Sequence, residues 1–309
     1  MAESAAGLAL TGRLTMPSSV TERFGNLRRR NTRPATNRCI IFLHLPKTAG
    51  ETLRRTFKWK YGSEMLHLHT LTEPAESLEQ VPLSKRRNAR VLTGHLHYGV
   101  HEYIPQRCEY ITLLREPVAR VISFYYYILG RTDHYRHAEL VRSGMSLEEF
   151  VRSSPERGFE NDQTRMLSGR GAGELDAGHL GREALDEAKR NLEKFLVVGL
   201  TERFDESFIL IRRALGWKFP LYLTTNVSRR QKPATATAVE LIRERNQLDL
   251  ELYDHARGLF SAAVQQQGAS LRHEVAIFQA LNQVPNRLRP HTPAHTPAPV
   301  RRLLQGLPR

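Results

Sequence analysis

Cysteine is nearly absent from the 309-residue sequence, which contains only Cys39 and Cys108. Two thiols cannot form a disulfide scaffold or a four-cysteine zinc site, so both of those classes are excluded. The sequence also lacks a run of about 18 apolar residues that would cross a bilayer. Its start lacks the apolar core of a signal peptide. As written, the chain is expected to be soluble and not exported.

Acidic residues are scarce relative to basic ones. There are 46 Lys and Arg against 32 Asp and Glu, and the formal net charge is +14. This excess indicates an anionic partner, such as nucleic acid, a membrane surface or a small phosphate or sulfate compound. Residues 1–38 and 285–309 each carry +5, which leaves +4 for residues 39–284. Both end segments lack apolar periodicity, so we predict a disordered basic arm over 1–38 and a disordered Pro/Arg-rich tail over 285–309.

The central residues 39–284 have the pattern of one α/β domain. Short β-rich runs alternate with helical patterns, and strands separated by helices predict a P-loop-like fold of three layers, in which a central, mainly parallel sheet is flanked by helices. The predicted strands are Cys39–Leu43, Arg90–Thr93, Tyr110–Leu114 and Phe195–Val198. The predicted helices are Glu51–Lys58, Pro117–Leu129, Glu183–Lys194, Phe204–Leu215 and one or two within Ala238–Gln267.

Chemistry in such a sheet is expected in the loops that follow the carboxyl ends of the strands. The first such loop, His44–Thr52, carries Lys47 just before a predicted helix. Backbone N–H groups and the positive end of the helix dipole would bind an anion there, and Lys47 would add a full charge. The loop is not a Walker A motif, in which the lysine directly follows a glycine. A plain Pro–Gly turn with a solvated lysine explains the same residues equally well.

The second loop places His95 directly after a predicted strand, in the run Thr93–Gly99. A histidine suits a general base because its ordinary pKa lies near neutral pH. The alternatives are a structural histidine that is hydrogen-bonded at the strand end, or one member of a metal-binding pair with His97.

The third loop begins at Arg115, and Ser123 follows eight residues later on a predicted helix. The two side chains would converge on one phosphate, since guanidinium and hydroxyl groups both donate to phosphate oxygens. Alternatively, Arg115 pairs with Glu116 or caps a neighbouring helix. The run Tyr125–Tyr127 that follows is interpreted as ordinary core and rim aromatics.

Together and in this order, the motifs resemble those of the carbohydrate sulfotransferases, especially the branch that contains heparan sulfate 2-O-sulfotransferase. Pro46–Gly50 is similar to the loop that binds the 5′-phosphosulfate of 3′-phosphoadenosine-5′-phosphosulfate (PAPS). Arg115–Ser123 is similar to the 3′-phosphate site, and Gly94-His95 to the loop of the catalytic base. Asn161–Leu167 and Ala184–Thr201 also resemble family segments.

The resemblance implies a PAPS-dependent enzyme that transfers a sulfuryl group to a hydroxyl of a carbohydrate. No acidic metal-binding motif accompanies the Lys47 loop, so we expect that no metal is required. The resemblance gives His95 the role of general base and Lys47 that of stabilising the leaving phosphate. The implied PAPS contacts are Lys47, Thr48, Ala49, Gly50, Thr52, Arg115, Ser123, Arg229 and Lys232. The last two lie in a basic run, Ser228–Pro233, where the family has a loop that closes over the nucleotide or contacts the acceptor.

Glu51 departs from the family pattern, which often has a small hydroxyl residue at that position. A carboxylate beside an anion site is unfavourable unless it points away. It would instead stabilise the start of the helix through the helix dipole.

Three rival functions remain open: a P-loop-type kinase or NTPase, a basic nucleic-acid-binding protein, and an inactive family member that only binds PAPS. The order of residues around Lys47 argues against the first. The concentration of charge in the two end segments, without a zinc-finger or RRM signature, argues against the second. The expected partners are therefore PAPS and a glycan, with no specific nucleic acid.

The expected location follows from the missing membrane segment. Animal members of the resembled family are usually anchored in the Golgi by an N-terminal membrane helix. The sequence has no such helix. This favours either a cytoplasmic enzyme, such as one of bacterial origin, or a truncated chain.

Overall fold

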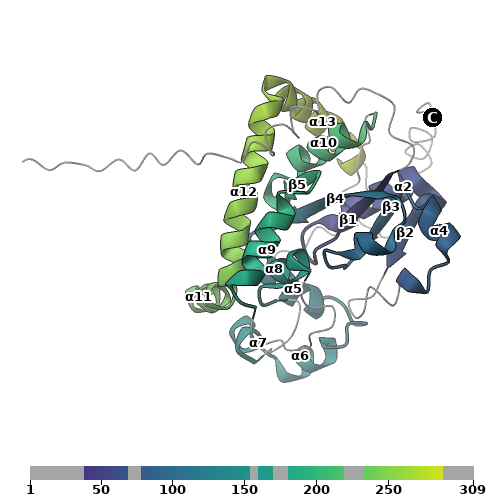
Figure 1. Ribbon diagram of the computed structural model, residues 1–309. Helices are drawn as coiled ribbons and strands as arrows, with labels where there is room; N and C mark the ends of the chain where they lie inside the picture. The colour runs from purple at the N-terminus through teal and green to yellow at the C-terminus, as the bar shows by residue number, and fades with distance from the viewer. Residues whose placement is uncertain (1–37, 69–77, 154–158, 170–179, 219–232, 288–309) are drawn as a thin grey trace, which may run out of the picture.

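The computed structural model describes residues 38–68, 78–153, 159–169, 180–218 and 233–287 (Figure 1). Residues 1–37 and 288–309, which include most of the predicted arm and tail, lie outside the described residues. The basic run that contains Arg229 and Lys232 lies outside them as well.

One sheet of five parallel strands forms the centre of the fold. In chain order these are β1 (Arg38–Leu43), β2 (Met65–Leu68), β3 (Val91–Gly94), β4 (Arg107–Leu114) and β5 (Val197–Leu200). In space their order is β2-β3-β1-β4-β5, and each pairing is parallel. The middle strand β1 buries Ile41, Phe42 and Leu43 completely, as a strand with both faces covered must.

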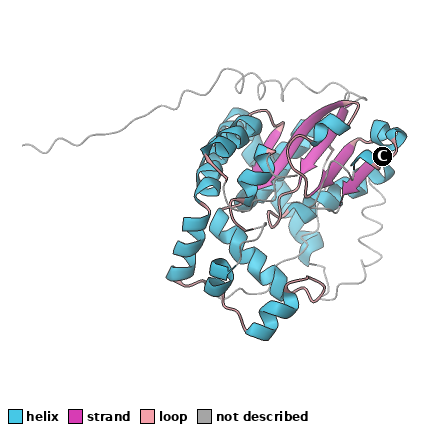
Figure 2. Ribbon diagram, turned by 60° about the horizontal axis from the view of Figure 1, so that its bottom comes forward, coloured by secondary structure: helices cyan, strands magenta, loops and turns pink. Residues whose placement is uncertain are grey.

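Helices cover both faces of the sheet (Figure 2). Helix α2 packs beside β2 and β3, whereas α10 and α12 pack against β5 at the other edge. The predicted three-layer α/β fold is therefore confirmed. The helices of the described residues are α2 (Gly50–Tyr61), α4 (Leu83–Asn88), α5 (Pro117–Leu129), α6 (His137–Ser143), α7 (Leu147–Ser153), α8 (Asp162–Ser168), α9 (Arg182–Leu192), α10 (Phe204–Leu215), α11 (Ala236–Arg245), α12 (Gln247–Gln267) and α13 (Ala269–Arg287). Short 3₁₀ turns cover Gly62–Glu64, Val100–Tyr103 and Thr201–Arg203.

A second apolar cluster lies outside the layers of the sheet. It joins α5 to α7 and α11 through Ile128, Phe150, Phe159 and Ile242, each at most 1% exposed. Figure 1 shows α6 and α7 together below the sheet, beside α5. This cluster fixes α5, the helix that follows the third loop.

The observed elements differ from the prediction in a few places. Helices α5 and α10 begin and end at the predicted residues. Strand β5 begins at Val197 rather than Phe195, because the N–H of Phe195 closes the turn after α9 on Leu192. Strand β2 was not predicted, because its sequence, Met65-Leu66-His67-Leu68, contains none of the β-branched or large aromatic residues that favour a strand. Helix α13 was not predicted either, and it ends at Arg287, beyond the predicted domain end at Val284.

Candidate active site

The three loops singled out in the sequence leave the sheet at one edge. β1 lies between β3 and β4, and Leu43 at its end pairs with Gly94 of β3. Because the strands are parallel, the loops that begin at His44, His95 and Arg115 all follow carboxyl ends. The N–H of His44 donates to the carbonyl oxygen of Gly94 at 3.1 Å, which ties the first loop to the second.

The loop between β1 and α2 is a tightly held turn. Lys47 and Ala49 both have left-handed backbone angles, with φ of 67° and 62°. For non-glycine residues this costs on the order of 1–3 kcal/mol each. The buried hydroxyl of Thr48 donates to the carbonyl oxygen of Leu45 at 2.8 Å, so its hydrogen is used within the loop. The loop is therefore a rigid turn with an internal hydrogen bond, and its binding of an anion remains a prediction.

Gly50, the first residue of α2, allows a histidine ring to lie against the helix start. A Cβ atom at this position would be 2.1 Å from Cδ2 of His44, far inside van der Waals contact. The His44 ring also stacks on Phe42, with ring centroids 5.4 Å apart. Desolvation by burial, followed by the nearby His95, lowers the pKa of His44 to about 3. His44 is therefore neutral near pH 7 and adds no charge to the loop.

Lys47 lies among other cations. Its Nζ is 3.9 Å from the centroid of the Tyr127 ring, and the guanidinium of Arg131 lies 5.5 Å from the same centroid. Arg115 donates from Nη1 to the carbonyl oxygen of Lys47 at 3.0 Å. Desolvation, with the charges of Arg115 and Arg131, lowers the pKa of Lys47 to about 8.

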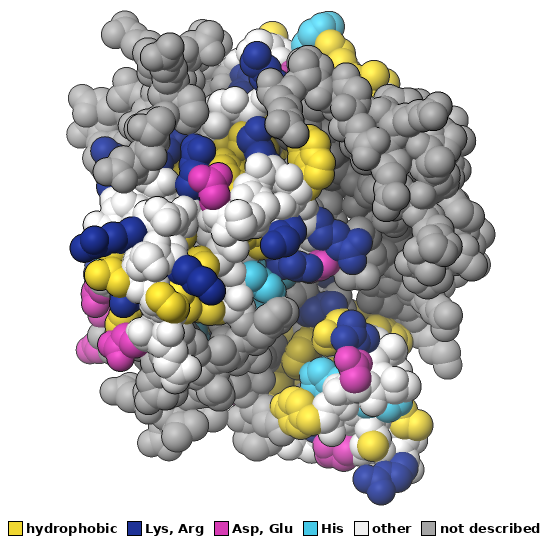
Figure 3. Space-filling view, turned by 90° about the vertical axis from the view of Figure 1, so that its right-hand side faces the viewer, with side chains coloured by type: hydrophobic (Ala, Val, Ile, Leu, Met, Phe, Trp, Pro, Cys, Tyr) yellow, Lys and Arg dark blue, Asp and Glu magenta, His cyan; other side chains and the backbone are white. Residues whose placement is uncertain are grey.

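This group of cations has the charge that a multiply charged anion requires. Cations that repel one another are stabilised when a phosphate or sulfate enters between them. Figure 3 shows a hollow in one face of the molecule, with Lys, Arg and His side chains around it. Lys47, Arg115 and Arg131 thus lie close together, although the folded part of the chain has a small net charge.

His95 is held in one defined tautomer. Its Nδ1 lies 2.7 Å from the backbone carbonyl oxygen of His44. A carbonyl oxygen only accepts hydrogen bonds, so Nδ1 carries the hydrogen and, in the neutral ring, Nε2 keeps the lone pair. The rings of His44 and His95 lie 4.7 Å apart and are tilted by 38°. As for a metal role with His97, no group of three or more His, Cys, Asp or Glu that could hold a metal ion occurs among the described residues.

Arg115 is fixed at its backbone as well as at its guanidinium. The side-chain amide of Gln163 accepts from the N–H of Arg115 and donates to its carbonyl oxygen, both at 3.0 Å. Glu116 uses its carboxylate to cap α5, accepting from the N–H of Ala119 at 2.7 Å. Burial lowers the pKa of Arg115 from its ordinary value, although Glu202 and Glu116 oppose the shift.

Glu51 forms ion pairs with its own helix rather than leaving an unpaired charge at the loop. Arg54 donates to both carboxylate oxygens at 2.7 Å, and Arg55 donates to one at 2.9 Å. Desolvation opposes ionisation of Glu51, but these arginine hydrogen bonds outweigh it and lower its pKa to about 2. The unfavourable carboxylate noted in the sequence is therefore compensated locally.

The predicted site residues fall into three groups. Those at the sheet edge are Lys47, Thr48, Ala49, Gly50, His95 and Arg115. Thr52 and Ser123 lie on α2 and α5, with 6% and 4% of their surface exposed. Arg229 and Lys232 lie outside the described residues. The convergence of Ser123 and Arg115 on one phosphate remains a prediction.

Sequence reasoning missed three residues of this region. Tyr127, interpreted as an ordinary aromatic, lies against Lys47. His44 supplies the carbonyl that orients His95. Gln163 binds the backbone of Arg115. Gln163 belongs to a segment that resembles the family, which was the one available signal, but its contact joins residues far apart in the sequence.

Comparison with known proteins identifies similar enzymes. The model of the galactose-3-O-sulfotransferase family matches residues 4–291. Galactose-3-O-sulfotransferase 3 of Homo sapiens is 28% identical over 248 residues, which cover 72% of this chain and 56% of that protein. Galactose-3-O-sulfotransferase 2 of Sus scrofa is 26% identical over 283 residues, 80% of this chain and 67% of that protein. Heparan-sulfate 6-O-sulfotransferase 1 of Homo sapiens is 30% identical over 189 residues, 52% of this chain and 45% of that protein.

These matches confirm the resemblance to carbohydrate sulfotransferases and do not specify the 2-O branch. They do not favour the kinase or nucleic-acid-binding alternatives. The chain spans between about half and two thirds of the length of these curated relatives.

The predicted cytoplasmic location is wrong. The matching galactose-3-O-sulfotransferases are of the Golgi type and are not cytoplasmic enzymes. The prediction relied on the lack of a membrane helix in the sequence. Within the described residues, no helix has both the length and the apolar composition needed to cross a membrane.

Proposed function

The chain belongs to the galactose-3-O-sulfotransferase family, and on this premise we propose that it transfers a sulfuryl group from PAPS to a hydroxyl of a carbohydrate, with His95 as the general base. The observation that carries the assignment to His95 is its 2.7 Å contact from Nδ1 to the carbonyl oxygen of His44. This contact places the ring hydrogen on Nδ1, so that Nε2 of the neutral ring has the lone pair that accepts a proton.

The reaction is an in-line displacement at sulfur. The acceptor hydroxyl gives its proton to Nε2 of His95 as its oxygen forms a bond to the sulfur. The bond between the sulfur and the 5′-phosphate oxygen breaks, and the electron pair stays on that phosphate. Lys47 donates to the leaving oxygen, where the negative charge develops. Positioning and electrostatics supply most of the rate, as in phosphoryl transfer.

The donor is held at two ends. The loop N–H groups of Thr48, Ala49 and Gly50, with the hydroxyl of Thr52, bind the 5′-phosphosulfate at the start of α2. Arg115 and Ser123 bind the 3′-phosphate. The contact from Nη1 of Arg115 to the carbonyl oxygen of Lys47 supports this arrangement, because it joins the two ends of the site.

Replacement of His95 tests the proposal. His95→Ala should reduce sulfuryl transfer by at least about 100-fold, the usual contribution of a general base. It should leave the affinity for 3′-phosphoadenosine-5′-phosphate (PAP) nearly unchanged in calorimetry. His273→Ala is the matched control, because His273 is exposed on α13, and it should change neither quantity. Near-normal transfer by His95→Ala would show that another group is the base.

A further inference from the structure

Helix α8 is unusual because it is both polar and buried. All seven residues of Asp162–Ser168 are buried, although five of them have polar or charged side chains. A buried polar group costs free energy unless it is hydrogen-bonded. The hydrogen bonds that satisfy these polar groups therefore tie α8 to the elements that pack around it.

The first of these contacts is made to Arg115. Gln163 is 0% exposed, and its Oε1 and Nε2 form a closed pair of 3.0 Å hydrogen bonds with the backbone N–H and carbonyl of Arg115. Arg115 directly follows the last residue of β4, Leu114, which pairs with β5. The amide of Gln163 thus bonds both backbone groups of the first residue after β4, as a neighbouring strand would.

Gln163 is itself anchored to α12. Its N–H donates to Oδ2 of Asp249 at 3.2 Å, while the N–H and hydroxyl of Thr164 donate to Oδ1 of Asp249 at 2.7 and 2.8 Å. Asp249 also pairs with the buried Arg120 at 3.7 Å. The carboxylate of Asp249 therefore caps the start of α8 and is balanced by a charge from α5.

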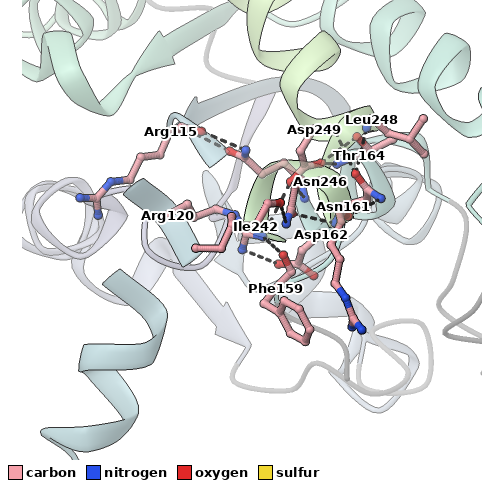
Figure 4. A network of polar contacts seen from close by, with 12 residues as sticks. Arg115, Arg120, Phe159, Asn161, Asp162, Thr164, Ile242, Asn246, Leu248 and Asp249 are labelled. Atoms are coloured by element: carbon pink, nitrogen blue, oxygen red, sulfur yellow. Dashed lines mark hydrogen bonds and ion pairs between the residues drawn. The ribbon is translucent and has the colours of Figure 1, made fainter. Parts of the chain in front are cut away.

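The capping is reciprocal. Asn161, which precedes α8 with a left-handed φ of 46°, accepts through Oδ1 from the N–H groups of Leu248 and Asp249 at 3.0 and 3.1 Å. Its own N–H donates to Oδ1 of Asn246 at 3.0 Å. Asp249 of α12 thus caps the start of α8, and Asn161, which directly precedes α8, caps the start of α12. The two helix starts are therefore held together. Figure 4 shows this network, with the Arg115 guanidinium directed away from it.

We propose that Gln163 is a positioning residue for nucleotide binding: it holds the Arg115 backbone so that the guanidinium points into the donor site. The proposal rests on the proposed function, in which Arg115 binds the 3′-phosphate. Since Arg115 also donates to the Lys47 carbonyl, a shift of its backbone would move both the guanidinium and that contact.

The test compares two nucleotides that differ only by the 3′-phosphate, PAP and adenosine 5′-phosphate, by calorimetry on the full chain. Gln163→Met keeps the side-chain size but removes both hydrogen bonds. It should weaken PAP binding about tenfold while changing adenosine 5′-phosphate binding little, so that the affinity ratio falls. Gln163→Glu keeps an acceptor for the Arg115 N–H, but its second oxygen faces the Arg115 carbonyl oxygen and repels it, so the ratio should fall in this variant as well.

The control for general destabilisation is Asn191→Leu. Asn191 is also a buried amide, and it donates to the carbonyl oxygen of Leu167 at the other end of α8. This variant should lower the unfolding temperature without changing the affinity ratio. An unchanged ratio in folded Gln163→Met, or in Gln163→Glu if the first variant does not fold, would overturn the proposal.

Arg115→Ala separates this proposal from the proposed function. If Arg115→Ala loses the preference for PAP while the Gln163 variants keep it, the role of Gln163 is wrong and the nucleotide site stands. If Arg115→Ala keeps the preference, Arg115 does not bind the 3′-phosphate, and both assignments fail together.

Discussion

At the scale of single residues, the site depends on groups whose ionisation is set by their surroundings. Lys47 is partly buried among cations and has a pKa of about 8, whereas His44 is buried and neutral. A lysine with a lowered pKa loses its charge at a pH where an exposed lysine keeps it. The charge that is needed for anion binding is therefore sensitive to mildly alkaline pH.

The pH dependence of turnover follows from this charge. Below pH 8 Lys47 is protonated, and above it the positive charge is progressively lost, so kcat/KM for PAPS should fall above about pH 8. Lys47→Arg should lower the overall rate and remove this alkaline decline, because arginine stays charged. A decline that is identical in Lys47→Arg would assign the titration to another group.

Gly50 provides a second prediction about a single residue. Gly50→Ala places a methyl group 2.1 Å from the His44 ring, so it should destabilise the fold by about 1–3 kcal/mol, as overpacking does. The matched variant is Gly258→Ala in α12, where nothing lies within 4 Å of the added Cβ. That change should stabilise the fold by about 0.5–1 kcal/mol, through helix propensity. Urea unfolding measures both, and equal effects of the two variants would refute the close contact.

At the scale of elements, Asp249 joins α5, α8 and α12 through its buried carboxylate. Its carboxylate is 0% exposed and binds Arg120, Gln163 and Thr164. Removing one partner of a buried charge pair leaves the other uncompensated. The three helices should therefore lose stability together.

Asp249→Ala should lower the free energy of unfolding by about 3–5 kcal/mol, the usual cost of breaking a buried pair. Asp254→Ala on the same helix removes a carboxylate that pairs with Arg257 at the surface, and it should change little. Chemical denaturation of the two variants is the measurement. A small loss in Asp249→Ala would mean that Asp162, which also contacts Arg120, suffices to balance that charge.

The elements also show what periodicity can predict. Helices α5 and α10 have a clear apolar face and begin after a loop or turn, and their observed bounds agree with the prediction. The four-residue β2 lacked a recognisable pattern. The start of β5 was set by the backbone closure of α9 and by pairing with β4, and neither of these is visible in the local sequence.

At the scale of the whole molecule, the parallel sheet explains why the sequence was informative about the site. Residues that follow strands meet at one edge, so their positions made His95 and Arg115 candidates, and the family resemblance gave each its predicted role. Their orientation was not predictable, because the carbonyl of His44 and the amide of Gln163 are tertiary partners. The location was predicted wrongly. The prediction used only the absence of an apolar run, and this absence says nothing about the class of enzymes to which the chain is related.

The central claim is that the chain transfers a sulfuryl group from PAPS to a carbohydrate. The most direct test incubates the full chain with sulfur-labelled PAPS and a panel of glycans that includes galactose-terminated and heparan-type acceptors, followed by mass spectrometry of the products. We expect labelled sulfate on a glycan hydroxyl and one PAP released per sulfate transferred. Binding of PAPS without any sulfated glycan would contradict the claim and would identify the chain as a nucleotide-binding relative without transferase activity.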